Sequence, residues 1–274
     1  MPRFAANLTT MFTELEPKDR FLAAYNAGFD AVEYLAPYGH DISELRSLLQ
    51  DAQLSMILLN TGIGDGQKGE RGLAALPGRE SDFESLFEQA LTYASALQVE
   101  MIHVMAGVVP ENSNAAICED TFIANLKRVA PIAAREKIKL LIEPLNTQDV
   151  PGYLHTNSGH ASRILAAVNE PNVRMQFDFY HLQVMEGNLG KNLEKHWDNI
   201  GHVQFSSVPG RHEPQYGEVN LPFLFTILDD REYAGWVGCE YSPKHSTSDG
   251  LSWAESYGIR PRIQSPGLDP RPIN

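Results

Sequence analysis

Four short apolar runs of the chain end on a side chain whose oxygen can bind a metal ion. The runs are KLLIE, RMQFD, GHVQ and WVGCE, which end at Glu143, Asp178, Gln204 and Glu240. Burial of an unpaired carboxylate costs several kcal/mol, so three acids among apolar residues need a partner or a cation. Two Glu, one Asp and one Gln supply only oxygen. This set predicts Mg²⁺ or Mn²⁺, with Co²⁺ as a substitute, rather than structural zinc.

The intervals between these four residues are 35, 26 and 36 residues, and each is long enough for a strand to return through a helix to a parallel neighbour. Eight apolar runs alternate with helical patterns along the chain: RFAANL, AVEYL, LSMILLN, MIHVMAG, KLLIEPL, VRMQFDF, GHVQFS and WVGCEY. This alternation predicts the α/β class, and the count of eight favours a (β/α)₈ TIM barrel over an open doubly wound sheet. In a barrel, the strand ends that carry the four polar residues converge.

The length of 274 residues fits one barrel domain, whose usual size is about 250 residues. We assign residues 1–256 to the barrel and residues 257–274 to a Pro-rich C-terminal tail, because four prolines occur in the last fourteen residues. A homo-oligomer is compatible with such a tail, which would then serve as an interface arm.

Local patterns predict a helix, two turns and one long loop. Gly28 and Gly201 are expected as left-handed helix C-caps. Residues 60–79, rich in Gly and charge, are expected to form a loop over the barrel mouth, either a lid or a plain surface loop. An apolar stripe at helical spacing runs through residues 118–137 and consists of Phe122, Leu126, Val129, Ala130 and Ala133.

The composition excludes several classes of function. A net charge of −13 leaves no basic surface for nucleic acid or anionic membranes. Cys118 and Cys239 lack the spacing of a disulfide framework or zinc knuckle, and no apolar run approaches the ~18 residues of a membrane span. We expect a cytoplasmic protein without a leader. No dinucleotide fingerprint follows the first strand, so no nucleotide cofactor is expected.

A set of segments resembles the hydroxypyruvate isomerase family of the xylose-isomerase-like barrels, from about residue 3 to residue 253. The segments are PRFAANL, GFDAVEYLAPY, ALPGRE, LIEPLN, VPGY, DFYHLQ, EGNL, GHVQ, RHEP, GEVN and GWVGCEY. The resemblance implies a divalent metal on Glu143, Asp178, Gln204 and Glu240, with Glu143 and Glu240 as the proton donor and acceptor pair. Ketose 3-epimerases are similar but usually carry His where Gln204 stands. This difference weakens the epimerase alternative without removing it.

Two residues on loops beyond the strands are candidates for substrate binding. His181 lies three residues past Asp178, and its counterpart in the related epimerases donates a hydrogen bond to a substrate oxygen. Arg211, in the segment PGRHEP, is expected to bind a substrate carboxylate through its planar guanidinium. Glu213 is expected to orient Arg211.

Three further polar residues are weaker candidates for contact with substrate. Asn60 and His103 are assigned to the substrate-binding set, although His103 fits a core histidine of the fourth strand equally well. Asn146 is a candidate for a supporting hydrogen bond.

The favoured activity is a metal-dependent isomerase that converts hydroxypyruvate to 2-hydroxy-3-oxopropanoate (tartronate semialdehyde) through an enediolate. A 2-oxotetronate isomerase is the alternative: HVMAGVVP and RHEP fit that group, whereas EPLN and VPGY favour hydroxypyruvate isomerase. More remote are a metal-dependent endonuclease for abasic DNA, which needs a basic surface and more histidine ligands, and a silent sugar-acid binder. The presence of both Glu143 and Glu240 argues against the silent binder.

Overall fold

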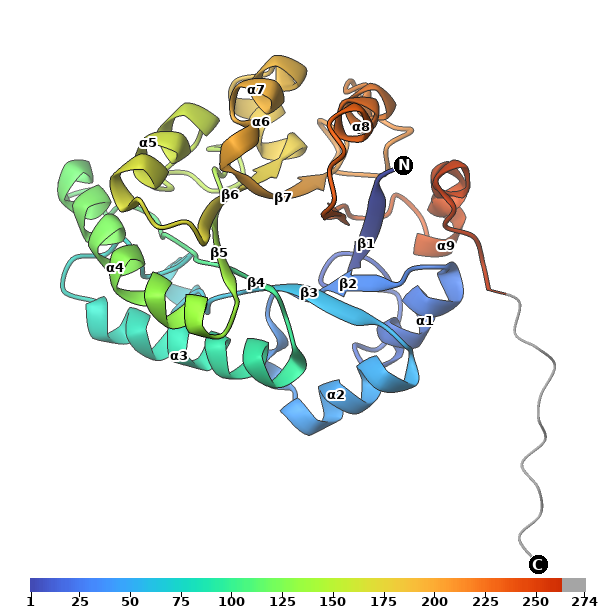
Figure 1. The fold of residues 1–274 in the computed structure, drawn as a ribbon, viewed down its shortest axis with the longest axis horizontal. Helices are drawn as coiled ribbons and strands as arrows, with labels where there is room; N and C mark the ends of the chain where they lie inside the picture. Colours follow the sequence, from blue (N-terminus) through green and yellow to red (C-terminus); the bar gives the residue numbers. More distant parts are fainter. Residues whose placement is uncertain (263–274) are drawn as a thin grey trace, which may run out of the picture.

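The eight apolar runs each form a strand, and the strands close into a parallel barrel inside a ring of helices (Figure 1). The computed structural model describes residues 1–262. Pairing of β1 with β8, from Arg3 opposite Trp236 to Ala6 opposite Cys239, closes the ring and confirms the predicted (β/α)₈ barrel. The strands are β1 (Arg3–Asn7), β2 (Ala31–Glu33), β3 (Ser55–Asn60), β4 (Met101–His103), β5 (Lys139–Ile142), β6 (Val173–Asp178), β7 (Ile200–Phe205) and β8 (Trp236–Cys239).

The helices follow the strands in the order expected for a TIM barrel, except that two α-helices, α6 and α7, lie between β6 and β7 in place of one. The predicted apolar stripe of residues 118–137 is buried on α4. The α-helices are α1 (Asp19–Ala27), α2 (Ile42–Asp51), α3 (Glu80–Leu97), α4 (Ala115–Arg135), α5 (Ser158–Val168), α6 (Phe179–Met185), α7 (Leu189–Lys195), α8 (Leu221–Asp230) and α9 (Thr247–Gly250). The 3₁₀ helices are η1 (Pro37–Gly39), η2 (Gly66–Lys68), η3 (Trp197–Asn199) and η4 (Leu251–Tyr257). None of the helices in residues 1–262 is long and apolar enough to cross a membrane.

The barrel interior changes from apolar to polar along the strands. Near the strand starts, six buried residues form an apolar cluster: Ala5, Ala31, Ile57, Leu58, Met101 and Leu141. Because side chains two residues apart on a strand point to the same side, the next inward layer lies two positions further on. That layer contains Asn7, Glu33, His103 and Glu143. The sequence therefore places a polar layer above an apolar plug, towards the C-terminal ends of the strands.

The two predicted C-cap glycines have different roles. Gly28 caps α1 with φ of 107°, as expected. Gly201 lies inside β7, and its expected C-cap role is wrong. A Cβ at Gly201 would lie 2.5 Å from the side chain of Arg174 and 2.9 Å from that of Leu141. Glycine is required there for space in the sheet, and not for a left-handed conformation.

The long loop of residues 60–79 is tied to the barrel rim along its second half. Gly72 pairs with Ala106 in an antiparallel bridge, and the N–H of Ala75 donates to the carbonyl of Ala106 at 2.8 Å. A second bridge joins Val108 to Tyr153, so the loops after β3, β4 and β5 share backbone hydrogen bonds. The lid interpretation therefore does not hold for residues 72–76. Residues 62–71 form the exposed part of this loop.

The described beginning of the predicted tail packs on the barrel. The guanidinium of Arg262 donates to the carbonyls of Tyr25 at 3.0 Å and Phe29 at 2.9 Å, and lies 4.0 Å from the ring centroid of Tyr25. Residues 258–262 thus cover the end of α1. Residues 263–274 of the predicted tail lie outside the described residues.

Candidate metal and catalytic site

The four residues chosen from the strand ends all lie at or near the C-terminal ends of their strands. Glu143 follows β5 directly, Asp178 ends β6, Gln204 is the penultimate residue of β7, and Glu240 follows β8 directly. Each is buried, with exposed fractions of 4%, 0%, 0% and 7%, respectively. A carboxylate at such a position is held by the strand before it and is shielded from bulk water. The top of the barrel is therefore a concentrated acidic site.

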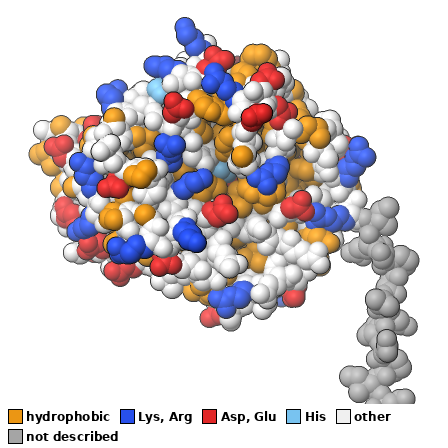
Figure 2. Space-filling view, viewed as in Figure 1, with side chains coloured by type: hydrophobic (Ala, Val, Ile, Leu, Met, Phe, Trp, Pro, Cys, Tyr) orange, Lys and Arg blue, Asp and Glu red, His pale blue; other side chains and the backbone are white. Residues whose placement is uncertain are grey.

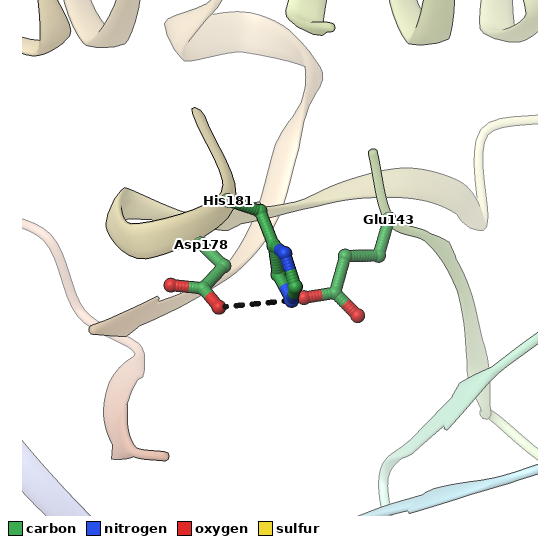
Figure 3. A group of neighbouring side chains, drawn as sticks. All are labelled: Glu143, Asp178 and His181. Carbon is green, nitrogen blue, oxygen red and sulfur yellow. Dashed lines mark ion pairs between the residues drawn. The ribbon is translucent and has the colours of Figure 1, made fainter. Parts of the chain in front are cut away.

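Three ligand-competent side chains meet in this site. One ligand atom from each of Glu143, Asp178 and His181 lies within 4.8 Å of the others. Figure 3 shows the three side chains pointing to a common region, with Glu143 just after β5, Asp178 at the end of β6 and His181 in α6. Glu143 Oε1 and Asp178 Oδ2 are buried without a hydrogen-bond partner. Unsatisfied buried oxygens of this kind are costly without a compensating charge. The residues present therefore fit a divalent cation.

The pKa values of Glu143, Asp178 and Glu240 also support a site for a cation. Burial raises the pKa of Glu143 well above its ordinary value, and the neighbouring Glu240 and Asp178 raise it further. Burial also raises the pKa of Asp178 to about 6 and that of Glu240 to about 8, against the opposing effect of Arg211. Three carboxylates so close cannot all ionise cheaply on their own. Glu240 is not part of the compact group of three, but it shares this field.

His181 is held by Asn146. Its Nδ1 accepts hydrogen bonds from the backbone N–H of Asn146 at 3.2 Å and from Asn146 Nδ2 at 2.8 Å. His181 Nε2 lies 3.7 Å from Asp178 Oδ2. Burial lowers the pKa of His181 well below its ordinary value, so the ring is neutral. The structure therefore places His181 and Asn146 together at the site, as their positions after strands β6 and β5 suggested.

Arg211 lies above Glu240 and is already paired. Its Nη2 is 3.4 Å from Glu240 Oε1, its Nη1 is 3.7 Å from Asp149 Oδ2, and its guanidinium carbon is 4.9 Å from the ring centroid of Tyr180. Its Nε is buried without a partner. Glu213 does not orient Arg211, contrary to expectation: its carboxylate accepts the N–H of Lys244 at 3.2 Å.

His103 and Asn60 occupy the opposite side of the mouth. His103 is buried, and its Nδ1 lies 3.3 Å from Glu143 Oε2. Burial lowers the pKa of His103 to about 3, so the ring is neutral. Asn60 ends β3, and its Nδ2 donates to the sulfur of Met105 at 3.6 Å. In the structure, His103 contacts a candidate base, whereas Asn60 Oδ1 is buried without a partner.

Comparison with known proteins assigns the fold to a family. A family model described as xylose isomerase-like TIM barrel matches residues 21–257. The chain belongs to this family. A relative named 2-oxo-tetronate isomerase, from Cupriavidus necator, is 46% identical over 257 residues, which cover 94% of this chain and 99% of the relative. A relative named hydroxypyruvate isomerase, from Escherichia coli, is 39% identical and is covered over 100% of its length, with 94% of this chain. The protein is an isomerase.

Two solved structures share the fold of this chain. A crystal structure from Brucella melitensis, named as an AP endonuclease of family 2, superposes with a TM-score of 0.92 at 45% identity, and the alignment covers 94% of this chain and 99% of that chain. A 3-keto-D-glucoside 4-epimerase from Escherichia coli superposes with a TM-score of 0.75 at 21% identity, over 93% of this chain and 99% of that one, which shows a shared fold.

Sequence reasoning missed a buried polar network beside this family's barrel mouth. Glu33 is fully buried at the end of β2 and accepts hydrogen bonds from Asn7 Nδ2 at 2.9 Å, from Gln204 Nε2 at 2.8 Å and from His202 Nε2. Gln204 Oε1 in turn accepts a hydrogen bond from Gln176 Nε2. The signal for Glu33 was present, since it follows an inward-facing alanine by two residues in the run AVEYL, as Glu143 follows Leu141.

Proposed function

We propose that the protein is a divalent-metal-dependent isomerase that interconverts a short 2-oxo-3-hydroxy acid and the corresponding 2-hydroxy-3-oxo acid. The observation that carries the proposal is the pair of buried, unpartnered oxygens of Glu143 and Asp178 in the barrel mouth. The names of the relatives support the substrate class. Hydroxypyruvate and 2-oxotetronate share a carboxylate, a C2 ketone and a C3 hydroxyl, and differ by one hydroxymethyl group on C3. One active site can therefore serve both reactions.

Glu143, Asp178, Gln204 and Glu240 are the residues that would hold the metal. A bound cation would supply polarisation of the substrate oxygens, which would acidify the C3–H bond. The oxygen-only donor set favours Mg²⁺ or Mn²⁺, with Co²⁺ as a substitute. The pKa values of Asp178 and Glu240 are raised when no cation is bound. A bound cation would lower them and would stabilise Glu143, Asp178 and Glu240 in their ionised form.

Glu143 and Glu240 are the proposed proton-transfer pair. In the forward direction one carboxylate removes the proton from C3 to give the enediolate, and a carboxyl group then returns a proton to C2. The hydroxyl proton moves from the C3 oxygen to the C2 oxygen, so the conversion is balanced without an oxidant or reductant. The two glutamates directly follow β5 and β8, which stand three strands apart in the ring of eight, so that a substrate can lie between them. Neutral His181 and His103 border this space.

Arg211 is the proposed anchor for the substrate carboxylate. Its side chain is 29% exposed, and its Nε has no partner. A carboxylate bound along the Nε edge would form charge-assisted hydrogen bonds in a site that is otherwise acidic. Asp149 and Glu240 on either side keep the guanidinium in place through contacts of 3.7 and 3.4 Å. The anchor therefore also connects substrate binding to the position of a candidate base.

Between the two substrates, 2-oxotetronate is the first to test. The relative named for it is 46% identical, against 39% for the relative named hydroxypyruvate isomerase. Hydroxypyruvate is the second substrate to test, because the motifs EPLN and VPGY favour hydroxypyruvate isomerase. The extra hydroxymethyl group of 2-oxotetronate carries a hydroxyl, and a site that hydrogen-bonds such a group can discriminate strongly against a substrate that lacks it.

The name of the Brucella melitensis protein raises the endonuclease alternative, which the charge of this chain does not support. A net charge of −13 opposes DNA, and Figure 2 shows basic side chains interspersed with acidic ones over the viewed face. Within residues 1–262, the one group of His, Cys, Asp and Glu with metal-binding geometry is that of Glu143, Asp178 and His181. We therefore expect no binding to duplex DNA that contains an abasic site.

A substrate panel tests the proposal. Purified protein is treated with chelator, checked by elemental analysis, and assayed with 2-oxotetronate and hydroxypyruvate before and after addition of Mg²⁺, Mn²⁺ or Co²⁺. Proton NMR in D₂O follows product formation and incorporation of deuterium at C2, which distinguishes an isomerase from a silent binder. Turnover that needs the metal supports the proposal. Full turnover by metal-free protein, or none of either acid by metal-loaded protein, contradicts it.

A further inference from the structure

The orientation of the Asn146 side chain is determined by its backbone neighbours. Asn146 is fully buried in the connection between β5 and α5. Its Oδ1 accepts the backbone N–H groups of Gln148 at 3.0 Å and Asp149 at 2.8 Å. Backbone amides are donors only through their N–H, so the atom that faces them must be the oxygen. The Nδ2 group is therefore the atom that faces His181.

His181 consequently receives two N–H donors at the same ring nitrogen. The backbone N–H and the Nδ2 group of Asn146 both point to His181 Nδ1, at 3.2 and 2.8 Å. An imidazole nitrogen that accepts a hydrogen bond carries no proton, so the ring proton is on Nε2. In a doubly protonated ring, the Nδ1–H group would face the two N–H donors of Asn146 with no acceptor between them. The contacts therefore select the neutral tautomer that is protonated on Nε2.

This tautomer decides what His181 offers to the acidic site. Its Nε2 faces Asp178, at 3.7 Å from Oδ2, and belongs to the group of three side chains in Figure 3. A protonated Nε2 has no lone pair for a cation. His181 is thus a hydrogen-bond donor inside a cluster whose other two members are oxygen ligands.

We propose that Asn146 is a positioning residue that holds His181 as a neutral Nε2–H donor, which keeps His181 out of the metal's ligand set and available to a substrate oxygen. This inference rests on the proposed function, because it assigns His181 to the oxygen that gains negative charge in the enediolate. A neutral imidazole stabilises such an oxygen by hydrogen bonding without transferring its proton to it. Proton transfer is then left to the two glutamates.

The tautomer can be measured without any turnover. The full chain is labelled with ¹⁵N-histidine, and the signal of His181 among the nine histidines is assigned by its loss in His181→Gln. Near neutral pH we expect Nε2 protonated and Nδ1 unprotonated, both before and after Mg²⁺ is added. A proton on Nδ1, a doubly protonated ring, or loss of the Nε2–H signal on addition of Mg²⁺ would overturn the proposal. These outcomes do not depend on whether a 2-oxo acid is the substrate.

Variants of Asn146 connect the tautomer to the reaction. Asn146→Asp places a carboxylate oxygen opposite Nδ1 and so demands a proton there. We expect kcat to fall about 10- to 100-fold, while the Mg²⁺ dissociation constant changes less than about threefold, and the NMR signal shifts to the Nδ1-protonated form. KM is not the readout here, because Asn146 Nδ2 also donates to Asp149 Oδ2 at 3.0 Å and Asp149 contacts Arg211. Asn146→Ala keeps the backbone donor to Nδ1 and should lose less in kcat. Thermal unfolding is measured for each variant, and Asn146→Ala carries the comparison if Asn146→Asp does not fold.

Asn157→Asp is the matched control. Asn157 lies in the same connection between β5 and α5, but its Oδ1 caps α5 by accepting the N–H of His160 at 2.9 Å, a role that Asp retains. This variant adds the same charge and should keep both the wild-type kcat and the wild-type His181 signal. If Asn146→Asp keeps the wild-type kcat, or loses Mg²⁺ affinity as steeply as kcat, Asn146 does not act through the His181 tautomer.

Discussion

Two buried carboxylate regions in one barrel differ in whether the protein itself satisfies them. The region around Glu33 joins β1, β2 and β7, and its carboxylate accepts hydrogen bonds from three side chains. The region around Glu143 and Asp178 joins β5 and β6, and there each residue has a buried oxygen without a partner. Residue type and depth are the same in the two regions. Burial of an acid therefore does not by itself indicate a metal site, whereas a buried carboxylate oxygen without a hydrogen-bond partner is a feature expected of one.

The largest expected effect tests the satisfied region. Glu33 accepts three hydrogen bonds. In Glu33→Gln, the NH₂ group of the new amide would face donors that now bind a carboxylate oxygen. We expect the free energy of unfolding to fall by about 3–5 kcal/mol, the usual cost of breaking a buried charged network. Urea denaturation measures it. Glu143→Gln is the matched control in the unsatisfied region, and without metal it should cost far less stability. Equal losses for the two variants would remove the distinction between the regions.

The next effect is catalytic and belongs to the unsatisfied region. Glu→Gln keeps the shape and a coordinating oxygen but removes the base, so Glu143→Gln and Glu240→Gln should each lose at least ~10²-fold in kcat. The metal content, measured by elemental analysis, should fall less than the rate. Near-normal turnover of either variant at full metal occupancy would show that the residue is not the base.

Metal and pH should act together on stability. Asp178 and Glu240 have folded-state pKa values of about 6 and about 8, above their ordinary values of 3.8 and 4.5. Their contribution to stability in metal-free protein is therefore complete below the ordinary values and is lost as pH rises through the folded ones. Metal at a concentration of about 100 times its dissociation constant raises the free energy of unfolding by about 2.7 kcal/mol. Thermal unfolding with and without Mg²⁺ should show a gap in Tm that widens towards pH 8, and a constant gap would contradict this account.

The smallest effect concerns the edge of the unsatisfied region. Arg211→Lys keeps the charge but loses the planar fork, so kcat/KM for a 2-oxo acid should weaken by about 1.5–3 kcal/mol. Turnover of a neutral ketose, where detectable, should change much less. Equal losses on both substrates would mean that Arg211 acts through its contact with Glu240 instead of through the substrate carboxylate.

The sequence predicted the barrel well because strands that alternate with helices leave a periodic pattern. It also predicted which acids stand at strand ends, since Glu143 and Asp178 close apolar runs. It did not predict the side-chain partners. The contact between Glu33 and His202 joins residues 169 positions apart, and Gly201 is explained by the bulk of Arg174 on the neighbouring strand. Such contacts depend on register and rotamer, which no local pattern specifies.

The bridges between Gly72 and Ala106 and between Val108 and Tyr153 limit how this enzyme can be redesigned or diversify. In many barrels each loop can be exchanged by itself, because it touches mainly its own strand and helix. Here the loops after β3, β4 and β5 share main-chain hydrogen bonds. Replacement of the loop after β4 alone would therefore leave backbone donors and acceptors of both neighbouring loops without partners. The unit of exchange on this side of the mouth is a triplet of loops, transplanted together.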